Sequence, residues 1–267
     1  MKRSLLIVLL MFIVGFSFAQ KPFQLGNIYK IHSKILNEDR VLNIYTPEGY
    51  HPDSATKYPV IYLLDGSANE DFVHVVGLVQ FLTMIEAMPK TIIVGIANID
   101  RRRDFTYPTT IENDKKDYPT TGSSAKFIKF LGEELQPYIV SKFKTGGSKT
   151  IIGQSLGGLL ATEILLKNSE LFNNYIIVSP SLWWNNESLL KNANAFINKE
   201  KLIDTKVYIA VGEEGERMKD DAKQLAQLIL QSEGATINLT FFEKEDHLTI
   251  LHNGLYQTLV KMYTKKK

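Results

Sequence analysis

A serine flanked by glycines carries the strongest chemical signal in the sequence, in the segment Gly153-Gln154-Ser155-Leu156-Gly157. The segment follows an apolar run at residues 150–153 and opens a run with helical spacing at residues 157–167. The pattern G-x-S-x-G between a strand and a helix is typical of a nucleophile elbow, in which the glycines leave room for a tight, strained turn. The N–H of Leu156, at the positive end of the following helix, can donate to an oxyanion. The pattern predicts that Ser155 is a nucleophile; the alternative is a glycine-rich turn with an inert serine.

A serine nucleophile needs a base, and on a sheet of this kind the chain order is serine, acid, histidine. Of the five histidines, that order leaves His247 and His252. His247 lies in a polar turn after an apolar strand predicted at residues 237–242, which brings it to the sheet edge where Ser155 lies. His252 falls inside a helix predicted at residues 248–264, where we expect a surface or packing role. We therefore expect His247 to be the base.

The acid is expected after the strand predicted at residues 207–211, where three glutamates follow: Glu213, Glu214 and Glu216. A carboxylate there can hold the imidazole in the correct tautomer and stabilise its protonated form. Glu214 lies in the middle of the turn, and Gly215 behind it allows a sharp bend. Glu214 is therefore the first choice, Glu216 the second, and no acid at all the third. The alternative is that the glutamates decorate the start of the next helix, which suits two of them.

Further binding residues are expected on neighbouring loops. Gly66 and Ser67 follow a strand predicted at residues 60–64, where backbone amides would supply the second oxyanion donor; the alternative is a tight turn only. Trp183 and Trp184 follow another strand and would wall an acyl or aromatic pocket, unless they pack beneath the loop.

A long loop at residues 99–121 contains Arg101-Arg102-Arg103 and two Tyr-Pro pairs. A loop of this length in a compact domain is more often functional than accidental. From it we predict Arg103 as a substrate-pocket residue; the alternative is a surface excursion with solvated charges.

The elements that must position these residues alternate along the chain. Residues 28–32 and 41–45 predict an antiparallel hairpin, and continuous apolar runs then predict strands that are buried on both faces, as in a parallel sheet. The strands are expected at residues 60–64, 91–96, 150–153, 175–178, 207–211 and 237–242, and helices at residues 73–87, 123–138, 157–167, 218–231 and 248–264. The pattern predicts an α/β fold, a three-layer α/β/α sandwich around a mostly parallel sheet of about eight strands, in one domain at residues 20–267.

Residues 1–19 have the features of a signal peptide. Lys2-Arg3 precedes an apolar run, and Ser17-Phe18-Ala19 offers a small-x-small cleavage site. The run is short for a membrane span, so we expect no stable membrane insertion after cleavage; an uncleaved anchor is the alternative. These features predict a periplasmic or secreted protein.

The composition limits the cofactors and partners. The chain has no cysteine, which excludes a lipoprotein anchor, disulfides, thiol catalysis and cysteine-ligated zinc. It also lacks histidines at metal-ligand spacing, so we expect no metal and no cofactor. Beyond residue 19 the chain carries 29 basic and 29 acidic residues, and this balance gives no reason to expect a nucleic acid partner. The expected partner is a small-molecule or glycan-linked ester.

Together these motifs resemble the putative esterase family of the α/β-hydrolase superfamily, which includes siderophore esterases, feruloyl esterases, S-formylglutathione hydrolase and mycolyltransferases. The matching segments include residues 60–66 (VIYLLDG), 151–161 (IIGQSLGGLLA) and 178–184 (VSPSLWW). The resemblance implies that Ser155 is the nucleophile and His247 the base. Family members place the acid where this chain has Gly215, and some siderophore esterases work with a Ser–His pair alone, so the acid stays open.

We therefore expect an exported serine carboxylic ester hydrolase that forms an acyl-enzyme on Ser155. One alternative is an acyltransferase of the same family, which would pass the acyl group to a sugar or lipid hydroxyl. Another is a binding module without catalysis.

Overall fold

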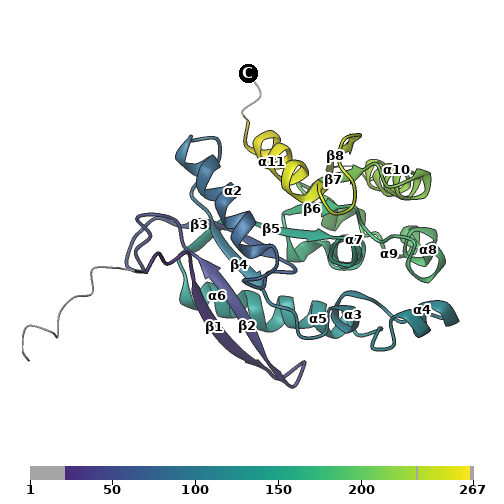
Figure 1. Cartoon of the computed structure of the whole chain (residues 1–267), viewed down its shortest axis with the longest axis horizontal. Coiled ribbons are helices and arrows are strands. Elements are labelled where there is room, and N and C mark those ends of the chain that lie inside the picture. The colour runs from purple at the N-terminus through teal and green to yellow at the C-terminus, as the bar shows by residue number, and fades with distance from the viewer. Residues whose placement is uncertain (1–21, 233, 265–267) are drawn as a thin grey trace, which may run out of the picture.

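A computed structural model describes residues 22–232 and 234–264. The predicted signal peptide at residues 1–19 lies outside these residues. One sheet of eight strands runs through the molecule in the order β1-β2-β4-β3-β5-β6-β7-β8 (Figure 1). The strands are β1 (Asn27–Ser33), β2 (Glu38–Tyr45), β3 (Tyr58–Leu63), β4 (Ile92–Ile96), β5 (Thr145–Gln154), β6 (Asn174–Val178), β7 (Lys206–Gly212) and β8 (Thr236–Phe242). β2 pairs antiparallel with β1 and β4, and the other neighbours pair in parallel, so the predicted mixed sheet is confirmed.

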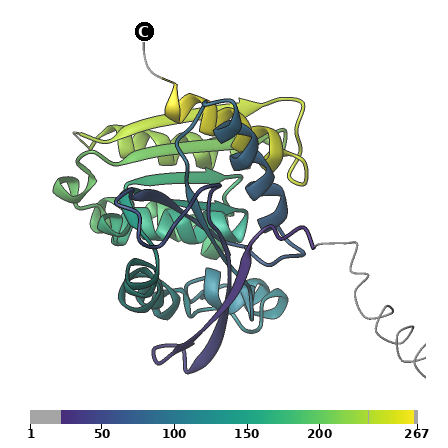
Figure 2. The same ribbon diagram turned by 90° about the vertical axis from the view of Figure 1, so that its left-hand side faces the viewer.

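Helices cover both faces of the sheet, which confirms the predicted three layers. α2 (Phe72–Met84) and α11 (Ile250–Tyr263) lie side by side on one face, blue and yellow in Figure 2. The other face carries α5 (Ser124–Phe130), the π-helical turn η1 (Leu131–Leu135), α6 (Gln136–Lys142), α7 (Leu156–Lys167) and α10 (Glu216–Leu230). Shorter elements complete the chain: α3 (Arg101–Phe105), α4 (Glu112–Asp117), η2 (Ser169–Leu171), α8 (Trp184–Lys191), α9 (Ala193–Phe196) and η3 (Lys199–Leu202).

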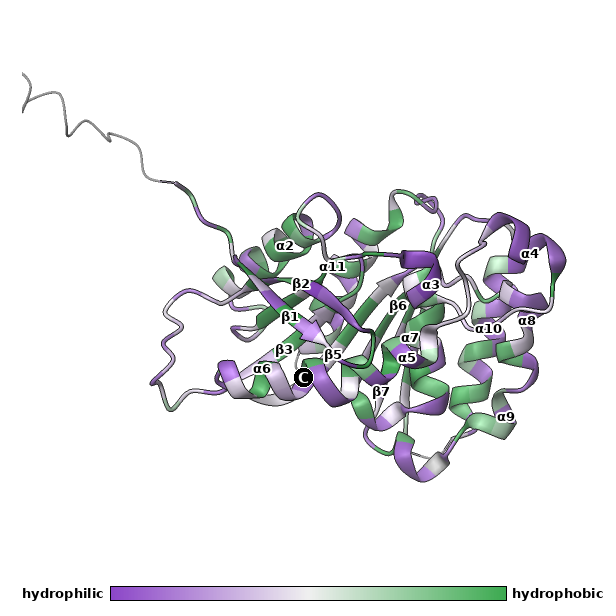
Figure 3. Cartoon of the chain, turned by 90° about the horizontal axis from the view of Figure 1, so that it is seen from below, coloured by the Kyte–Doolittle hydropathy of each residue, from purple (hydrophilic) through white to green (hydrophobic). Residues whose placement is uncertain are grey.

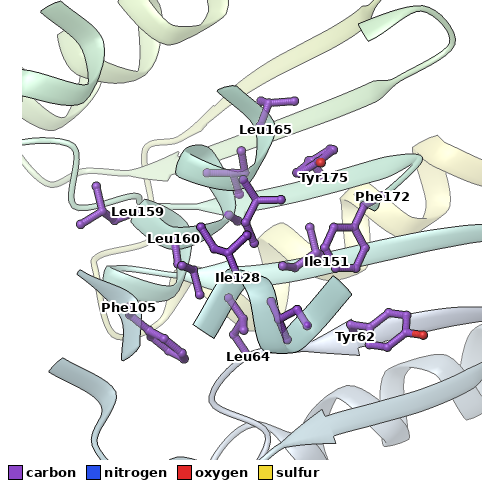
Figure 4. Close-up of a cluster of buried hydrophobic side chains, with 14 of the residues drawn as sticks. Tyr62, Leu64, Phe105, Ile128, Ile151, Leu159, Leu160, Leu165, Phe172 and Tyr175 are labelled. Atoms are coloured by element: carbon purple, nitrogen blue, oxygen red, sulfur yellow. The ribbon is translucent and has the colours of Figure 1, made fainter. Parts of the chain in front are cut away.

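The strands β4, β6 and β7 are buried at nearly every position because they contact helices on both sides. In β5, Ile151 packs into the core on the α7 side, whereas Ile152 packs on the α2 and α11 side. Figure 4 shows Leu160 of α7 in the same cluster as Ile151 and Tyr175. Residues 156–166 of α7 are all buried, so every face of this helix up to Leu166 packs against the rest of the protein. A central, rigid helix therefore begins directly after Ser155.

The predicted long loop at residues 99–121 is not structureless, because it contains α3 and α4. None of the residues of α4 is buried, and this helix is coloured hydrophilic in Figure 3. α3 is anchored instead by a buried ion pair. Nη1 of Arg40 in β2 donates to Oδ2 of Asp104 at 2.7 Å, and both side chains are fully buried. This pair fixes α3 to the sheet.

We expect Arg40→Met to lower the free energy of unfolding by about 3 kcal/mol, because it leaves the buried Asp104 carboxylate with Arg103 as its remaining cationic partner. Urea unfolding of the two proteins measures the difference. Lys30→Met removes an exposed cation from the neighbouring strand and should change stability by less than about 0.5 kcal/mol. An equally small change in Arg40→Met would contradict the role given to the pair.

Candidate active site

Ser155 occupies a strained turn between β5 and α7. Its backbone has φ 59° and ψ −118°, a conformation that residues with a side chain rarely adopt. A Cβ at Gly153 would overlap the carbonyl group of Gly157, and one at Gly158 would come within 2.9 Å of the Pro180 backbone. Close backbone approach therefore requires Gly153, as the elbow pattern predicts, and Gly158, whereas a Cβ at Gly157 would meet only the side chains of Asp65 and Leu64, at 3.3 Å or more.

The loops that follow β7 and β8 meet at the same edge of the sheet as Ser155. The N–H of Glu213 donates to the carbonyl of Glu245 at 2.6 Å, and a Cβ at Gly212 would come equally close to that carbonyl oxygen. Asp246 accepts the N–H groups of the two residues after His247 and so fixes the turn. In this arrangement the Glu214 carboxylate contacts Nδ1 of His247 directly.

The Glu214 side chain is only 6% exposed, whereas that of His247 is 41% exposed. Burial raises the pKa of Glu214, but the hydrogen bonds from His247 and Ser179 outweigh it and hold the pKa below the ordinary 4.5. Glu214 is therefore an anion at neutral pH. The other two glutamates point elsewhere: Glu213 pairs with Lys219, and Glu216 is 80% exposed at the start of α10.

This lowered pKa predicts a pH dependence of stability. A carboxylate with a folded-state pKa below its unfolded value of 4.5 contributes stability above about pH 4.5, and the contribution is lost as the pH falls through the folded-state pKa. Glu214→Gln removes the titrating group. We therefore expect the difference in Tm between the wild type and Glu214→Gln to narrow as the pH is lowered from 6 to 3. A difference in Tm that widens towards low pH would contradict the lowered pKa of Glu214.

The nucleophile and the base are linked through the last residue of β5, Gln154. Nε2 of Gln154 donates to the main-chain carbonyl of His247 at 2.5 Å. The Ser155 hydroxyl lies 3.3 Å from the hydroxyl of Ser181, and among the described residues it makes no hydrogen bond to the imidazole. Hydrogen bonds between catalytic groups are often long without substrate and shorten when it binds. The structure thus brings Ser155, His247 and Glu214 to one edge, with the His247–Glu214 contact already made.

The predicted oxyanion donors differ in availability. The N–H of Leu156 opens α7 and has no preceding helical turn to donate to. The N–H of Ser67 donates to the Glu70 side chain at 3.2 Å, an exposed contact that a substrate oxygen can replace. The prediction for Gly66 is corrected, because its N–H donates to the Ile96 carbonyl at 3.0 Å. Its lack of a side chain serves close packing on β4 instead.

Only one of the two tryptophans can line an open pocket. Trp184 is fully buried, and its Nε1 donates to the Tyr107 carbonyl at 2.9 Å, so the prediction that it walls the pocket is corrected. It turns inward at the start of α8 and packs beneath the loop. Trp183 is half-buried, and its ring lies 6.4 Å from that of Tyr118. Arg102 lies over the Tyr118 ring at 4.9 Å.

Arg103 is also corrected as a pocket residue. Its guanidinium pairs with Asp104 and with Glu38 on β2, on the side of α3 that faces the hairpin. Arg101 is the arginine that reaches the elbow: it binds both oxygens of Asp65, at 2.6 and 2.9 Å, and donates to the Gln154 carbonyl at 3.2 Å. Residues two apart on a helix face different directions. The sequence of three consecutive arginines therefore does not show which of them points to the site.

The remaining histidine candidate lies on a different surface. His252 lies against His74 of α2, with ring centroids 4.9 Å apart.

Among residues 22–232 and 234–264, no group of three or more His, Cys, Asp or Glu residues could hold a metal ion. No helix in the same ranges is long and apolar enough to cross a membrane.

A serine elbow at the carboxyl end of a central parallel strand, on a sheet covered by helices on both faces, defines the α/β-hydrolase class. The sequence model of the family described as "Putative esterase" matches residues 33–248, and the chain belongs to this family.

Relatives agree with this membership. The ferri-bacillibactin esterase BesA of Bacillus subtilis is 31% identical over 248 residues, which cover 80% of this chain and 82% of the relative. The BES protein of Bacillus cereus superposes with a TM-score of 0.79 at 30% identity, covering 92% of this chain and 98% of the other. An IroE-like serine hydrolase of Shewanella oneidensis superposes with a TM-score of 0.77 at 29% identity, covering 89% and 80%. The chain is a carboxylic ester hydrolase.

Proposed function

We propose that this protein is an exported siderophore esterase that works through an acyl-enzyme on Ser155. The observation that carries the mechanism is the contact between the buried Glu214 carboxylate and His247, at the sheet edge where the elbow exposes Ser155. Nucleophile, acid and base follow one another along the chain in the order that this fold requires.

In the first half-reaction, the Ser155 hydroxyl attacks the ester carbonyl and gives its proton to Nε2 of His247. Glu214 stabilises the imidazolium through Nδ1. The N–H groups of Leu156 and Ser67 donate to the oxyanion of the tetrahedral intermediate. His247 then protonates the leaving alcohol, the ester C–O bond breaks, and the acyl group remains on Ser155.

In the second half-reaction, water replaces the alcohol. His247 takes a proton from the water as it attacks the acyl-enzyme carbonyl, and returns a proton to Ser155 as the acid product leaves. Replacement of the water by a sugar or lipid hydroxyl would make the same site an acyltransferase.

Two observations support a siderophore as the substrate. BesA, which is similar over most of both chains, is named for a ferric siderophore. Trp183, two residues after the Ser181 that contacts Ser155, also lies against Tyr118, and Arg102 lies over the Tyr118 ring, which makes an aromatic and cationic cluster. Flat rings and a guanidinium suit a ligand that combines aromatic groups with negative charge.

A substrate panel tests this proposal. Purified protein would be incubated with a ferric siderophore trilactone, a feruloyl sugar ester and an acetyl sugar ester, each with and without a sugar acceptor, and the products identified by mass spectrometry. We expect kcat/KM to be highest for the siderophore and unchanged by the acceptor. Transfer of the acyl group to the acceptor would favour the acyltransferase, and binding without turnover would favour a non-catalytic module.

Export is proposed from the sequence of residues 1–19, with its basic start, apolar run and Ser17-Phe18-Ala19. N-terminal sequencing of the protein recovered from the periplasm or the medium should begin at Gln20. A chain that keeps Met1 and stays with the membrane would support the uncleaved anchor instead.

A reaction carried by the side chains and backbone of the protein alone predicts resistance to chelators. We expect incubation with excess EDTA to leave turnover of an iron-free test ester within about twofold of the untreated enzyme, because no step of the mechanism uses a metal. The iron-free ester ensures that removal of iron from the substrate is not mistaken for an effect on the enzyme. Loss of activity that zinc restores would contradict the proposed mechanism.

A further inference from the structure

Ser179, which directly follows β6, combines strain with complete burial. Its φ is 41°, in the left-handed region that favours glycine, and its side chain is fully buried. Its N–H donates to the Ala210 carbonyl at 2.8 Å, which anchors the strained residue to β7. Strain of this kind persists where the surrounding structure imposes it, and it gathers at functional sites.

The Ser179 hydroxyl donates to Oε1 of Glu214. The same oxygen accepts the Gly212 N–H at 3.1 Å, while Oε2 contacts His247. Both carboxylate oxygens are therefore occupied, and the acid has one orientation. Two residues further on, the Ser181 hydroxyl lies 3.3 Å from that of Ser155, so residues 179–181 contact both the acid and the nucleophile.

We infer that Ser179 is a positioning residue for the reaction, which fixes Glu214 in the orientation and ionised form that His247 requires. The inference rests on the proposed function. A glycine would adopt the backbone conformation of residue 179 without strain, so relief of strain does not explain a serine there. What the serine adds is the hydroxyl, and its partner is the Glu214 carboxylate.

Loss of this hydroxyl has a consequence that a purely structural role would not produce. The groups that face the carboxylate are His247, the Ser179 hydroxyl and the Gly212 N–H, and the hydrogen bond from Ser179 helps to lower the pKa of Glu214. A carboxylate that leaves this orientation stabilises the imidazolium of His247 less. The acidic limb of the kcat/KM profile should therefore move to lower pH.

The test compares Ser179→Gly with Ser179→Ala. Both variants remove the hydroxyl, but glycine accepts the φ of 41° and alanine does not, so the glycine variant should have the higher Tm. We expect both variants to lose about 10–100-fold in kcat with little change in KM, because the misplaced acid acts in the chemical step. Both should also show the shifted acidic limb. Wild-type kcat and an unshifted profile in the glycine variant would overturn the inference.

A double-mutant cycle with Glu214→Gln identifies the route of the effect. If Ser179 acts through Glu214, Ser179→Gly should change kcat less than about twofold in the Glu214→Gln background. A full 10–100-fold loss in that background would overturn the inference. If the wild type is active and Ser179→Gly is unaffected, the inference about Ser179 is refuted but the proposed function is not. If Ser155→Ala is as active as the wild type, the proposed function is refuted as well.

Discussion

Ser155→Ala is expected to lower kcat for ester hydrolysis by roughly 10⁴–10⁶-fold. The variant loses the atom that forms the acyl-enzyme but keeps the oxyanion donors and the binding surface, so a small residual rate above that in water should remain. The substitution removes one oxygen from a half-buried site, and the fold should be intact by circular dichroism. Stopped assays at high enzyme concentration measure the residual rate.

Ser141→Ala is the matched control, because Ser141 is an exposed serine in α6 whose hydroxyl bonds only its own helix among the described residues. Its kcat should equal that of the wild type within about twofold. An active Ser155→Ala variant would contradict the whole mechanism.

Glu214→Gln is expected to lower kcat by roughly 10–10⁴-fold. Glutamine has the shape of glutamate but lacks the charge that stabilises the imidazolium, and its amide can present an N–H where Nδ1 of His247 needs an acceptor. KM should change little, because Glu214 is buried behind the base and does not face the substrate side.

The neighbouring glutamates provide controls with the same chemical change. Glu213→Gln and Glu216→Gln alter carboxylates that point to Lys219 and to solvent, so both variants should stay near the wild-type rate. A large loss of activity in Glu216→Gln would instead identify Glu216 as the acid. If all three variants are active, the site is a Ser155–His247 dyad.

The fold was predictable because its central strands are buried on both faces. Runs such as residues 175–178 are apolar at every position, and glycines required by close backbone approach mark the elbow. The prediction was less accurate where tertiary contacts decide the extent or regularity of an element. Residues 145–149 extend β5 by pairing with β3, although they are mostly polar or glycine. The helix predicted at residues 123–138 contains a π-helical turn directly before α6, where Pro137 cannot donate to the preceding turn.

Side-chain direction limited the prediction of the site. The elbow and the histidine loop carry local signals, but the side chains of Arg101 and Arg103 diverge on one short helix, and the sequence does not show which of them faces Ser155. Side-chain direction also differs between the adjacent tryptophans: Trp183 is half-buried, whereas Trp184 is fully buried. Gly66 is a glycine because β4 is close, and neither spacing nor composition reveals such a contact. Ser179 gives no local signal, since its partner Glu214 lies 35 residues away.

Covalent labelling tests most directly whether Ser155 is the nucleophile. A fluorophosphonate probe is added to the purified enzyme, and the labelled peptide is identified by mass spectrometry. We expect one adduct per chain, on Ser155, which forms as activity is lost and which an excess of ester substrate delays. An adduct on another residue that accompanies the loss of activity, or full ester turnover by protein labelled on Ser155, would contradict the role of Ser155 as the nucleophile.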